Sequence, residues 1–90
     1  MKYLKFDLGK QNKGKIVELT MSGTAANAKL MNRMNFYNYE RARVYSYEGG
    51  LVTKSPAVFT IPGPDHWYLV IDTKGLEGME KDITASVKIL

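Results

Sequence analysis

The residues best suited to contact a ligand lie in one stretch, NFYNYERARVYSY, from Asn35 to Tyr47. It interleaves five aromatic rings with Arg41 and Arg43, and Arg33 stands just before it. Aromatic faces and guanidinium groups are what proteins use to bind single-stranded nucleic acid. The same composition suits a packed corner of a small β-domain, because tyrosine buries its ring and keeps its hydroxyl in water. We expect a packed corner, with at most two of these tyrosines free.

His66 is the only histidine in the chain, and Asp65 precedes it. A catalytic triad would need Asp65 to orient the His66 ring, but adjacent residues of a strand point to opposite faces. A chain this short also offers little room for a water-excluding cleft with an oxyanion site. We therefore expect His66 to be hydrogen-bonded at the start of a strand, and a small hydrolase is the least favoured function.

The sequence gives no sign of a metal or cofactor. The chain has no cysteine, which excludes disulfides and thiolate zinc sites. One histidine among scattered carboxylates has no recognised metal-ligand spacing. No glycine-rich phosphate loop with its lysine and hydroxyl is present. We expect no metal site, no cofactor and no enzymatic activity.

Length and charge limit the classes further. Ninety residues form a single domain, 1–90, in which nearly every large ring is needed for the core. The net charge of +4 permits attraction to anions without requiring it. No apolar run approaches the length of a membrane span, and Lys5 with Asp7 interrupts any signal-peptide core. We expect a soluble, cytoplasmic protein that does not bind a membrane.

The dominant hydrophobic period is two, which indicates half-buried strands. The expected strands are 4–8, 15–22, 44–47, 57–61, 66–72 and 83–90. The segment 66–72 is nearly all apolar, so it is the candidate for a central strand buried on both faces. After 44–47, the sequence Glu48-Gly49-Gly50 predicts a reversal or bulge of the backbone.

The segment 24–34 is ambiguous. Thr24 would cap a helix whose apolar residues recur every four positions. Asparagines at positions 27, 32, 35 and 38 favour the alternative, a short strand 27–31 followed by a loop, since their side chains compete for backbone partners. We expect an all-β fold with at most one short helix, an antiparallel β-sandwich or partly open barrel of about six to eight strands. Whether edge strands pair into a homo-oligomer stays open.

Several short motifs together resemble one domain family along the whole chain. They are Asn27, Leu30-Met31, Asn35-Phe36, Tyr39, Gly49-Gly50, Ser55-Pro56, Ile61-Pro62, His66-Trp67, Asp72 and Ala85-Ser86-Val87. The family is an uncharacterised bacterial one of unknown function, found as short stand-alone proteins and ahead of TIR domains. The resemblance implies a compact, mostly β-domain in the bacterial cytoplasm and carries over no functional residues. The chain departs from the family pattern at Ala42, where glycine is expected, and at Pro64-Asp65.

We therefore expect a non-enzymatic binding or sensing β-module for a small ligand or a protein partner. Its contact surface is expected at segments 32–43 and 62–65, because binding loops on a rigid sandwich are common. The alternative is a weak single-stranded nucleic-acid-binding domain. The candidate binding residues are Arg33, Asn35, Tyr37, Arg41, Arg43, Asp65 and His66.

Overall fold

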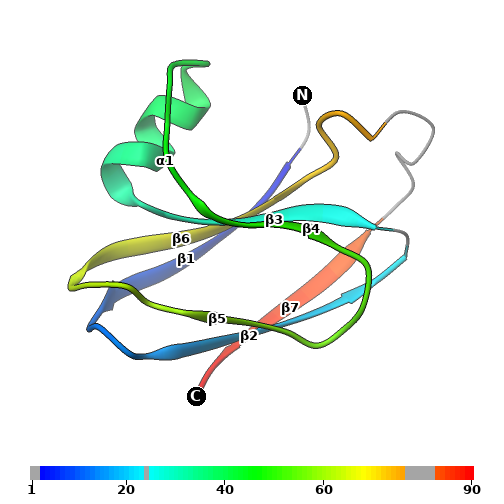
Figure 1. The fold of residues 1–90 in the computed structure, drawn as a ribbon, viewed down its shortest axis with the longest axis horizontal. Helices are drawn as coiled ribbons and strands as arrows, with labels where there is room; N and C mark the ends of the chain where they lie inside the picture. Colours follow the sequence, from blue (N-terminus) through cyan, green and yellow to red (C-terminus); the bar gives the residue numbers. More distant parts are fainter. Residues whose placement is uncertain (1–2, 24, 77–82) are drawn as a thin grey trace.

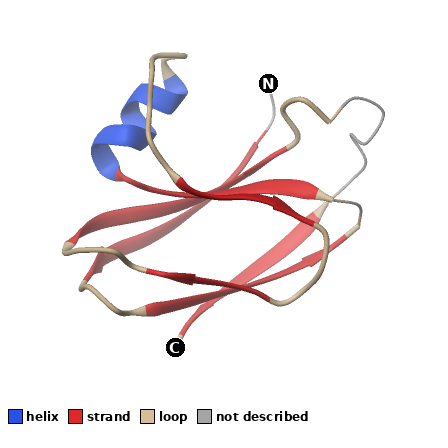
Figure 2. Ribbon diagram, viewed as in Figure 1, coloured by secondary structure: helices blue, strands red, loops and turns tan. Residues whose placement is uncertain are grey.

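The computed structural model describes residues 3–23, 25–76 and 83–90 of the chain. These residues form seven strands and one helix (Figures 1 and 2): β1 (Tyr3–Gln11), β2 (Ile16–Ser22), β3 (Ala26–Asn32), α1 (Arg33–Glu40), β4 (Glu48–Val52), β5 (Ala57–Thr60), β6 (Asp65–Asp72) and β7 (Thr84–Ile89). They build two antiparallel sheets, with strand orders β1-β6-β3-β4 and β5-β2-β7. The predicted β-sandwich with one short helix is confirmed.

Strand β6 lies in the middle of the four-stranded sheet, between β1 and β3, as its apolar sequence predicts. Successive side chains of a strand point to opposite faces. Trp67, Leu69 and Ile71 accordingly pack into the core between the two sheets. Val70 and Tyr68 belong to a second cluster on the opposite face, where α1 lies (Figure 1). Burial on both faces explains why β6 is apolar almost throughout.

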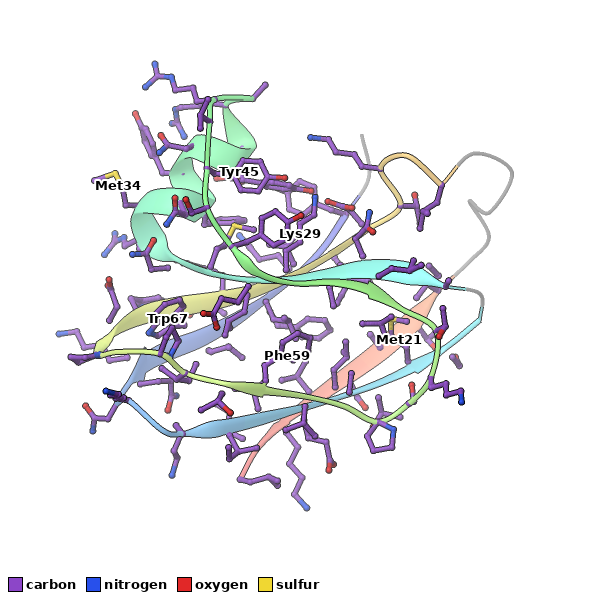
Figure 3. All side chains as sticks on the ribbon, in the orientation of Figure 1. Met21, Lys29, Met34, Tyr45, Phe59 and Trp67 are labelled. Atoms are coloured by element: carbon purple, nitrogen blue, oxygen red, sulfur yellow. The ribbon has the colours of Figure 1, made fainter. Side chains whose placement is uncertain are left out.

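The main core fills the space between the two sheets. Trp67 is 9% exposed, and its indole N–H donates to the carbonyl of Gly63 at 2.9 Å. Figure 3 shows Trp67 and Phe59 between the sheets, and Phe59 packs against the buried cluster. Trp67 thus agrees with the expectation that nearly every large ring is needed for the core. The fully buried members of this core with the largest side chains are Leu19, Leu30, Ile61, Leu69 and Val17.

The segment 24–34 contains the expected strand, but the loop predicted after it is wrong: β3 runs directly into α1. One of the asparagines that seemed to oppose a helix instead starts it. Asn32 is the N-cap, and its side-chain oxygen accepts the backbone N–H of Asn35 at 3.0 Å. Asparagine is among the best N-cap residues for this reason. Thr24, the alternative cap, lies outside the described residues.

Packing, more than its own sequence, stabilises α1. A helix of eight residues is marginal in water by itself. Phe36 and Tyr39, one turn apart, are buried against the sheet beside Met31 and Val70. This helix is too short and polar to cross a membrane, and no other helix occurs in the described residues.

The chain leaves α1 through a left-handed residue. Ala42 has a φ of 54°, and its N–H donates to the carbonyl of Tyr39 at 3.2 Å. Helices commonly end with glycine in this conformation, because a Cβ there costs about 1 kcal/mol. The glycine expected at position 42 from the family pattern therefore has a physical reason, and alanine keeps the shape at some cost.

The strand predicted at 44–47 is wrong. Residues 41–47 form a loop beside α1, and the strand β4 begins one residue later, at Glu48. The reversal or bulge predicted at Gly49 and Gly50 is also wrong, since both lie within β4 in regular register with β3, with φ values of 120° and 152°. At Gly49 an added Cβ would lie 2.1 Å from the carbonyl oxygen of Ala28. Glycine here allows close approach of two backbones rather than a turn.

Replacing Gly49 with alanine should therefore destabilise the fold by about 2 kcal/mol or more, because backbone strain and a backbone clash add. Urea unfolding of Gly49→Ala and wild type measures the difference. Gly63→Ala is the matched control, because a Cβ at Gly63 meets nothing within 4 Å and should leave stability nearly unchanged. Equal stability of the two variants would contradict this account of β4.

Candidate functional site

A pocket of about 410 Å³ opens at one corner of the sandwich. Three segments meet there: the end of β1 with the following turn, the start of α1, and the turn leading into β6. We call it the corner pocket; its lining residues are Lys10, Gln11, Asn12, Arg33, Pro64, Asp65 and His66. All of these except Pro64 are polar, so the corner pocket suits a polar ligand.

A β-bulge in β1 shapes one wall of the corner pocket. The pairing of β1 with β6 shifts register between Asp7 and Gly9, and Gly9 has a φ of 70°. The bulge keeps Lys10 directly opposite His66 while Asp7 stays on the same side of the sheet. Asp7 Oδ1 accepts the Gly9 N–H at 2.8 Å and approaches His66 Nε2 to 2.6 Å.

The Asp7–His66 contact fixes the imidazole. An ionised carboxylate only accepts hydrogen bonds, so Nε2 of His66 must carry the proton and only Nδ1 stays available. The N–H of Gly9 and the His66 ring, both donating to the carboxylate, hold the pKa of Asp7 below its ordinary value. The expectation of a hydrogen-bonded His66 is confirmed, but its partner is Asp7.

Asp65 is oriented by two donors. Its Oδ1 accepts the backbone N–H of His66 at 2.7 Å, and its Oδ2 accepts the side-chain amide of Asn32 at 3.1 Å. Asn32 is also the N-cap of α1, so this contact couples the helix start to the turn before β6. Neither Lys10 nor Arg33 forms an ion pair within the described ranges.

Beneath α1, on the other half of the same sheet face, lies a buried polar cluster that we call the lysine–tyrosine network: Asn27, Lys29, Tyr39, Tyr45 and Asp72. Lys29 Nζ is 3.0 Å from Asp72 Oδ2, and these residues are 5% and 2% exposed. Asp72 also accepts the Tyr39 hydroxyl at 2.7 Å and the Asn27 amide at 2.9 Å. Lys29 donates to the Tyr45 hydroxyl at 2.9 Å. Figure 3 shows Lys29 and Tyr45 close together above the sheet.

Tyrosine rings surround the Lys29 ammonium. Its Nζ lies 5.2–5.5 Å from the ring centroids of Tyr39, Tyr45 and Tyr47, within the range of cation–π attraction. The rings of Tyr39 and Tyr45 meet edge to face at 5.1 Å. No buried side-chain polar atom lacks a hydrogen-bond partner in the part of the chain that the structure describes. Each buried polar atom of the network therefore has at least one partner within the protein.

Both charges of the network are retained despite burial. Burial alone would lower the pKa of Lys29, but hydrogen bonds to Tyr45 and Asp72 and the charge of Asp72 raise it overall. Burial would likewise raise the pKa of Asp72, yet the donors Asn27, Tyr39 and Lys29 lower it. Burial and the hydrogen bond to Asp72 raise the pKa of Tyr39 well above its ordinary value. Lys29 therefore stays an ammonium at neutral pH and is a poor nucleophile or base.

The structure divides the candidate residues between two ends of α1. It brings Arg33, Asp65 and His66 together in the corner pocket. Arg41 follows the end of α1, eight residues from Arg33, or about 12 Å along a helix axis. The three arginines thus form no single cluster.

The remaining candidates lie along α1 and the loop after it. Asn35 has a structural role, because its amide donates to Asn32 and its oxygen accepts the Ser46 N–H. Tyr37 is 45% exposed, with the Arg41 guanidinium 3.6 Å from its ring centroid. Arg43 is exposed at the far end of α1.

The aromatic stretch 35–47 is mainly a packed corner, as expected. Tyr39 is buried and Tyr45 half-buried, whereas Tyr37 and Tyr47 are each 45% exposed. Two tyrosines are therefore partly free, which is the upper limit that we predicted.

Sequence reasoning missed Lys10 in the corner pocket, Asp7 as the partner of His66, and the buried pair of Lys29 and Asp72. Lys29 follows the alternation of its strand like any solvent-facing lysine, so nothing marks its burial. The one available signal was Asp72, an acid that closes an otherwise apolar central strand.

Residues 1–89 match the family described as a domain of unknown function (DUF1883), and the chain belongs to this family. No curated protein and no solved structure matches the chain. The family assigns no residue roles, so functional conclusions rest on the geometry of the site.

The lysine–tyrosine network predicts how stability depends on pH. The folded-state pKa of Asp72 lies below its ordinary 3.8, so its contribution is present above about pH 4 and is lost as pH falls through the folded value. The folded-state pKa of Lys29 lies above 10.5 and that of Tyr39 above 10.0, so their contributions are lost as pH rises past about 10. Urea unfolding from pH 2 to 11 should show a plateau between two falling limbs.

Asp72→Asn should lower the plateau and flatten its acid limb. Glu48→Gln, at an exposed acid of β4, should leave both unchanged. Acid limbs of equal steepness in Asp72→Asn and wild type would show that another carboxylate governs acid unfolding.

Proposed function

We propose that this domain is a non-enzymatic binding module, and that the corner pocket holds a small polar ligand with an anionic group. The observation that carries the proposal is that two cationic side chains, Lys10 and Arg33, both line a pocket of small-molecule size. The one acid that lines the pocket, Asp65, already accepts two hydrogen bonds from the protein. A phosphate or carboxylate would give Lys10 and Arg33 the partner that they lack among the described residues.

The place of Arg33 supports an anionic ligand. Arg33 is the first residue of α1, and no acidic residue lies in the first turn. A cation at this end of a helix opposes the helix dipole and costs roughly 0.3–1 kcal/mol. Arginine there is unfavourable for the helix alone and becomes favourable when an anion is bound beside it.

The non-enzymatic part of the proposal rests on the surroundings of His66. Its Nε2 is committed to Asp7, and no serine or threonine hydroxyl bonds to its ring within residues 3–23, 25–76 and 83–90. The same residues contain no group of three side chains able to hold a metal ion. A sensing role in the bacterial cytoplasm, beside TIR domains in longer proteins, is the biological setting that we propose.

Single-stranded nucleic acid is the less favoured ligand. Two of the four tyrosines that would stack bases are instead used in the lysine–tyrosine network. Arg33 lies at the opposite end of α1 from Arg41 and Arg43, so a strand would have to follow the helix to meet all three. This route would run over an exposed helix face, whereas the corner pocket is concave.

The test is a thermal-shift panel of sugar phosphates, small dicarboxylates and matched neutral sugars. An anionic ligand at a hundred times its Kd contributes about 2.7 kcal/mol, which is a Tm rise of roughly 10 °C or more in a domain this small. Lys10→Gln with Arg33→Gln should abolish the shift. Arg43→Gln with Lys54→Gln removes the same charge outside the pocket and should preserve it.

A shift that survives the pocket variant would place the ligand elsewhere. Binding of neutral sugars alone would reject the anionic group but keep the pocket. No shift from any compound would remove small-ligand binding altogether and leave protein partners as the remaining class.

A further inference from the structure

A second exposed surface follows one side of α1, from its second residue to the loop after the helix, and shares no residue with the corner pocket. We call it the arginine–apolar patch: Met34, Tyr37, Arg41, Arg43 and Val44. Val44 is 93% exposed, Met34 67% and Tyr37 45%. In Figure 3 the Met34 side chain points away from the body of the protein. Met34 and Tyr37 lie one turn apart on α1 and so share a face of the helix, and exposed apolar side chains that lie together mark interaction sites.

Hydrogen bonds hold the loop that carries Arg43 and Val44 against α1, which carries the other residues of the patch or precedes them directly. The loop runs beside α1, because the N–H of Arg43 donates to the Asn38 carbonyl at 2.9 Å and the N–H of Ser46 donates to the Asn35 side chain at 2.9 Å. Val44 lies between these two contacts and is therefore fixed next to the middle of the helix. Its exposure belongs to an ordered, hydrogen-bonded loop.

The underlying network gives the patch a rigid base. Tyr39, from the helix, donates to Asp72, and Tyr45, from the loop, accepts from Lys29. Both contacts reach the buried ion pair of the sheet. A surface held in this way binds a partner with little further loss of conformational entropy.

The composition of the patch is that of a protein interface. Methionine, tyrosine and arginine are enriched at the centres of such interfaces. Arg41 stacks on Tyr37 at 3.6 Å and donates to its carbonyl at 3.4 Å, which orients the guanidinium group. Arg41 and Arg43 form no ion pair among the described residues. The acid at the end of α1, Glu40, already accepts the Tyr3 hydroxyl at 2.7 Å.

We propose that the arginine–apolar patch docks an acidic segment of a partner protein, in which Asp or Glu residues flank an apolar side chain. The carboxylates would bind Arg41 and Arg43, whose planar forks match that group. The apolar side chain would cover Met34 and Val44. An anionic membrane needs a broader apolar face than two aliphatic side chains provide. Nucleic acid would use the arginines but leave Val44 and Met34 uncovered.

The direct test is selection of binders to the intact chain from a random 12-residue display library, followed by affinity measurement on the selected synthetic peptides. Peptides with at least two acids around an aliphatic or aromatic residue should be enriched. Arg41→Glu with Arg43→Glu should weaken their binding at least tenfold, and added salt should weaken it in wild type.

Two further variants separate charge from apolar contact and from net charge. Met34→Gln with Val44→Ser keeps both arginines and should also lower affinity. Lys54→Glu with Lys88→Glu makes the same charge change away from α1 and should leave affinity within twofold. Thermal unfolding of each variant confirms that it is folded, since all of these side chains are exposed.

Two parallel titrations complete the experiment, with a 12-nucleotide thymidine oligomer and with phosphatidylserine vesicles. Selection of peptides without acids, or peptide binding that the Arg41/Arg43 reversal leaves intact, would overturn the proposal. So would an oligomer or vesicle that binds wild type while no selected peptide does. None of these variants changes a residue of the corner pocket, so this result does not test the ligand proposed for that pocket.

Discussion

The buried pair of Lys29 and Asp72 is the interaction on which the helix-covered face of this domain depends. Two charges that are 5% and 2% exposed carry a large desolvation cost, which is offset only when every donor and acceptor is satisfied. Here strands β3 and β6 provide the charges, α1 provides Tyr39, and the following loop provides Tyr45. The ion pair is therefore satisfied only when helix and loop are both docked on the sheet.

The stability of the ion pair is therefore linked to the position of α1 and its loop on the sheet. The sandwich core between the two sheets is apolar and contains no residue of α1, whereas the outer face of β6 ends in a charged Asp72 that α1 helps to cover. Docking α1 fixes its first residue, Arg33, at the corner pocket. It also fixes the following loop, which carries Val44. One buried network thus helps to position both the corner pocket and the arginine–apolar patch.

Much of the sandwich was predictable, because apolar and polar residues alternate along a half-buried strand. The strands β1, β2, β5 and β7 follow that pattern, whereas β6 is recognisable by its nearly continuous apolar sequence. The helix was not predictable by the same means. Its eight residues present only Phe36 and Tyr39 to the sheet, too few to establish a helical period, and its N-cap is an asparagine that also suits a loop.

The site was only partly predictable, because its contacts depend on register. Asp7 meets His66 only through the bulge at Gly9, and no property of residues 59 positions apart in the chain indicates that contact. Lys29 is buried because a tyrosine from α1 and another from the loop cover it. A reversal or bulge was predicted at Gly49 because its true constraint, the nearby backbone of Ala28, belongs to another strand. In each case the deciding neighbour is distant along the chain, and the sequence does not reveal it.

Native-state hydrogen exchange of Asp72→Asn tests most directly whether the network holds α1 and its loop on the sheet. Removing one partner of a buried pair costs about 3–5 kcal/mol. In the variant, the amides of Ala42, Arg43 and Ser46 should exchange through an opening much cheaper than the one that exposes Val17 and Leu19 of β2. Glu40→Gln, which alters only the exposed bond to Tyr3, should keep the wild-type pattern. If the 42–46 amides and those of β2 lose protection equally, or neither does, the network does not hold the helix and loop in place.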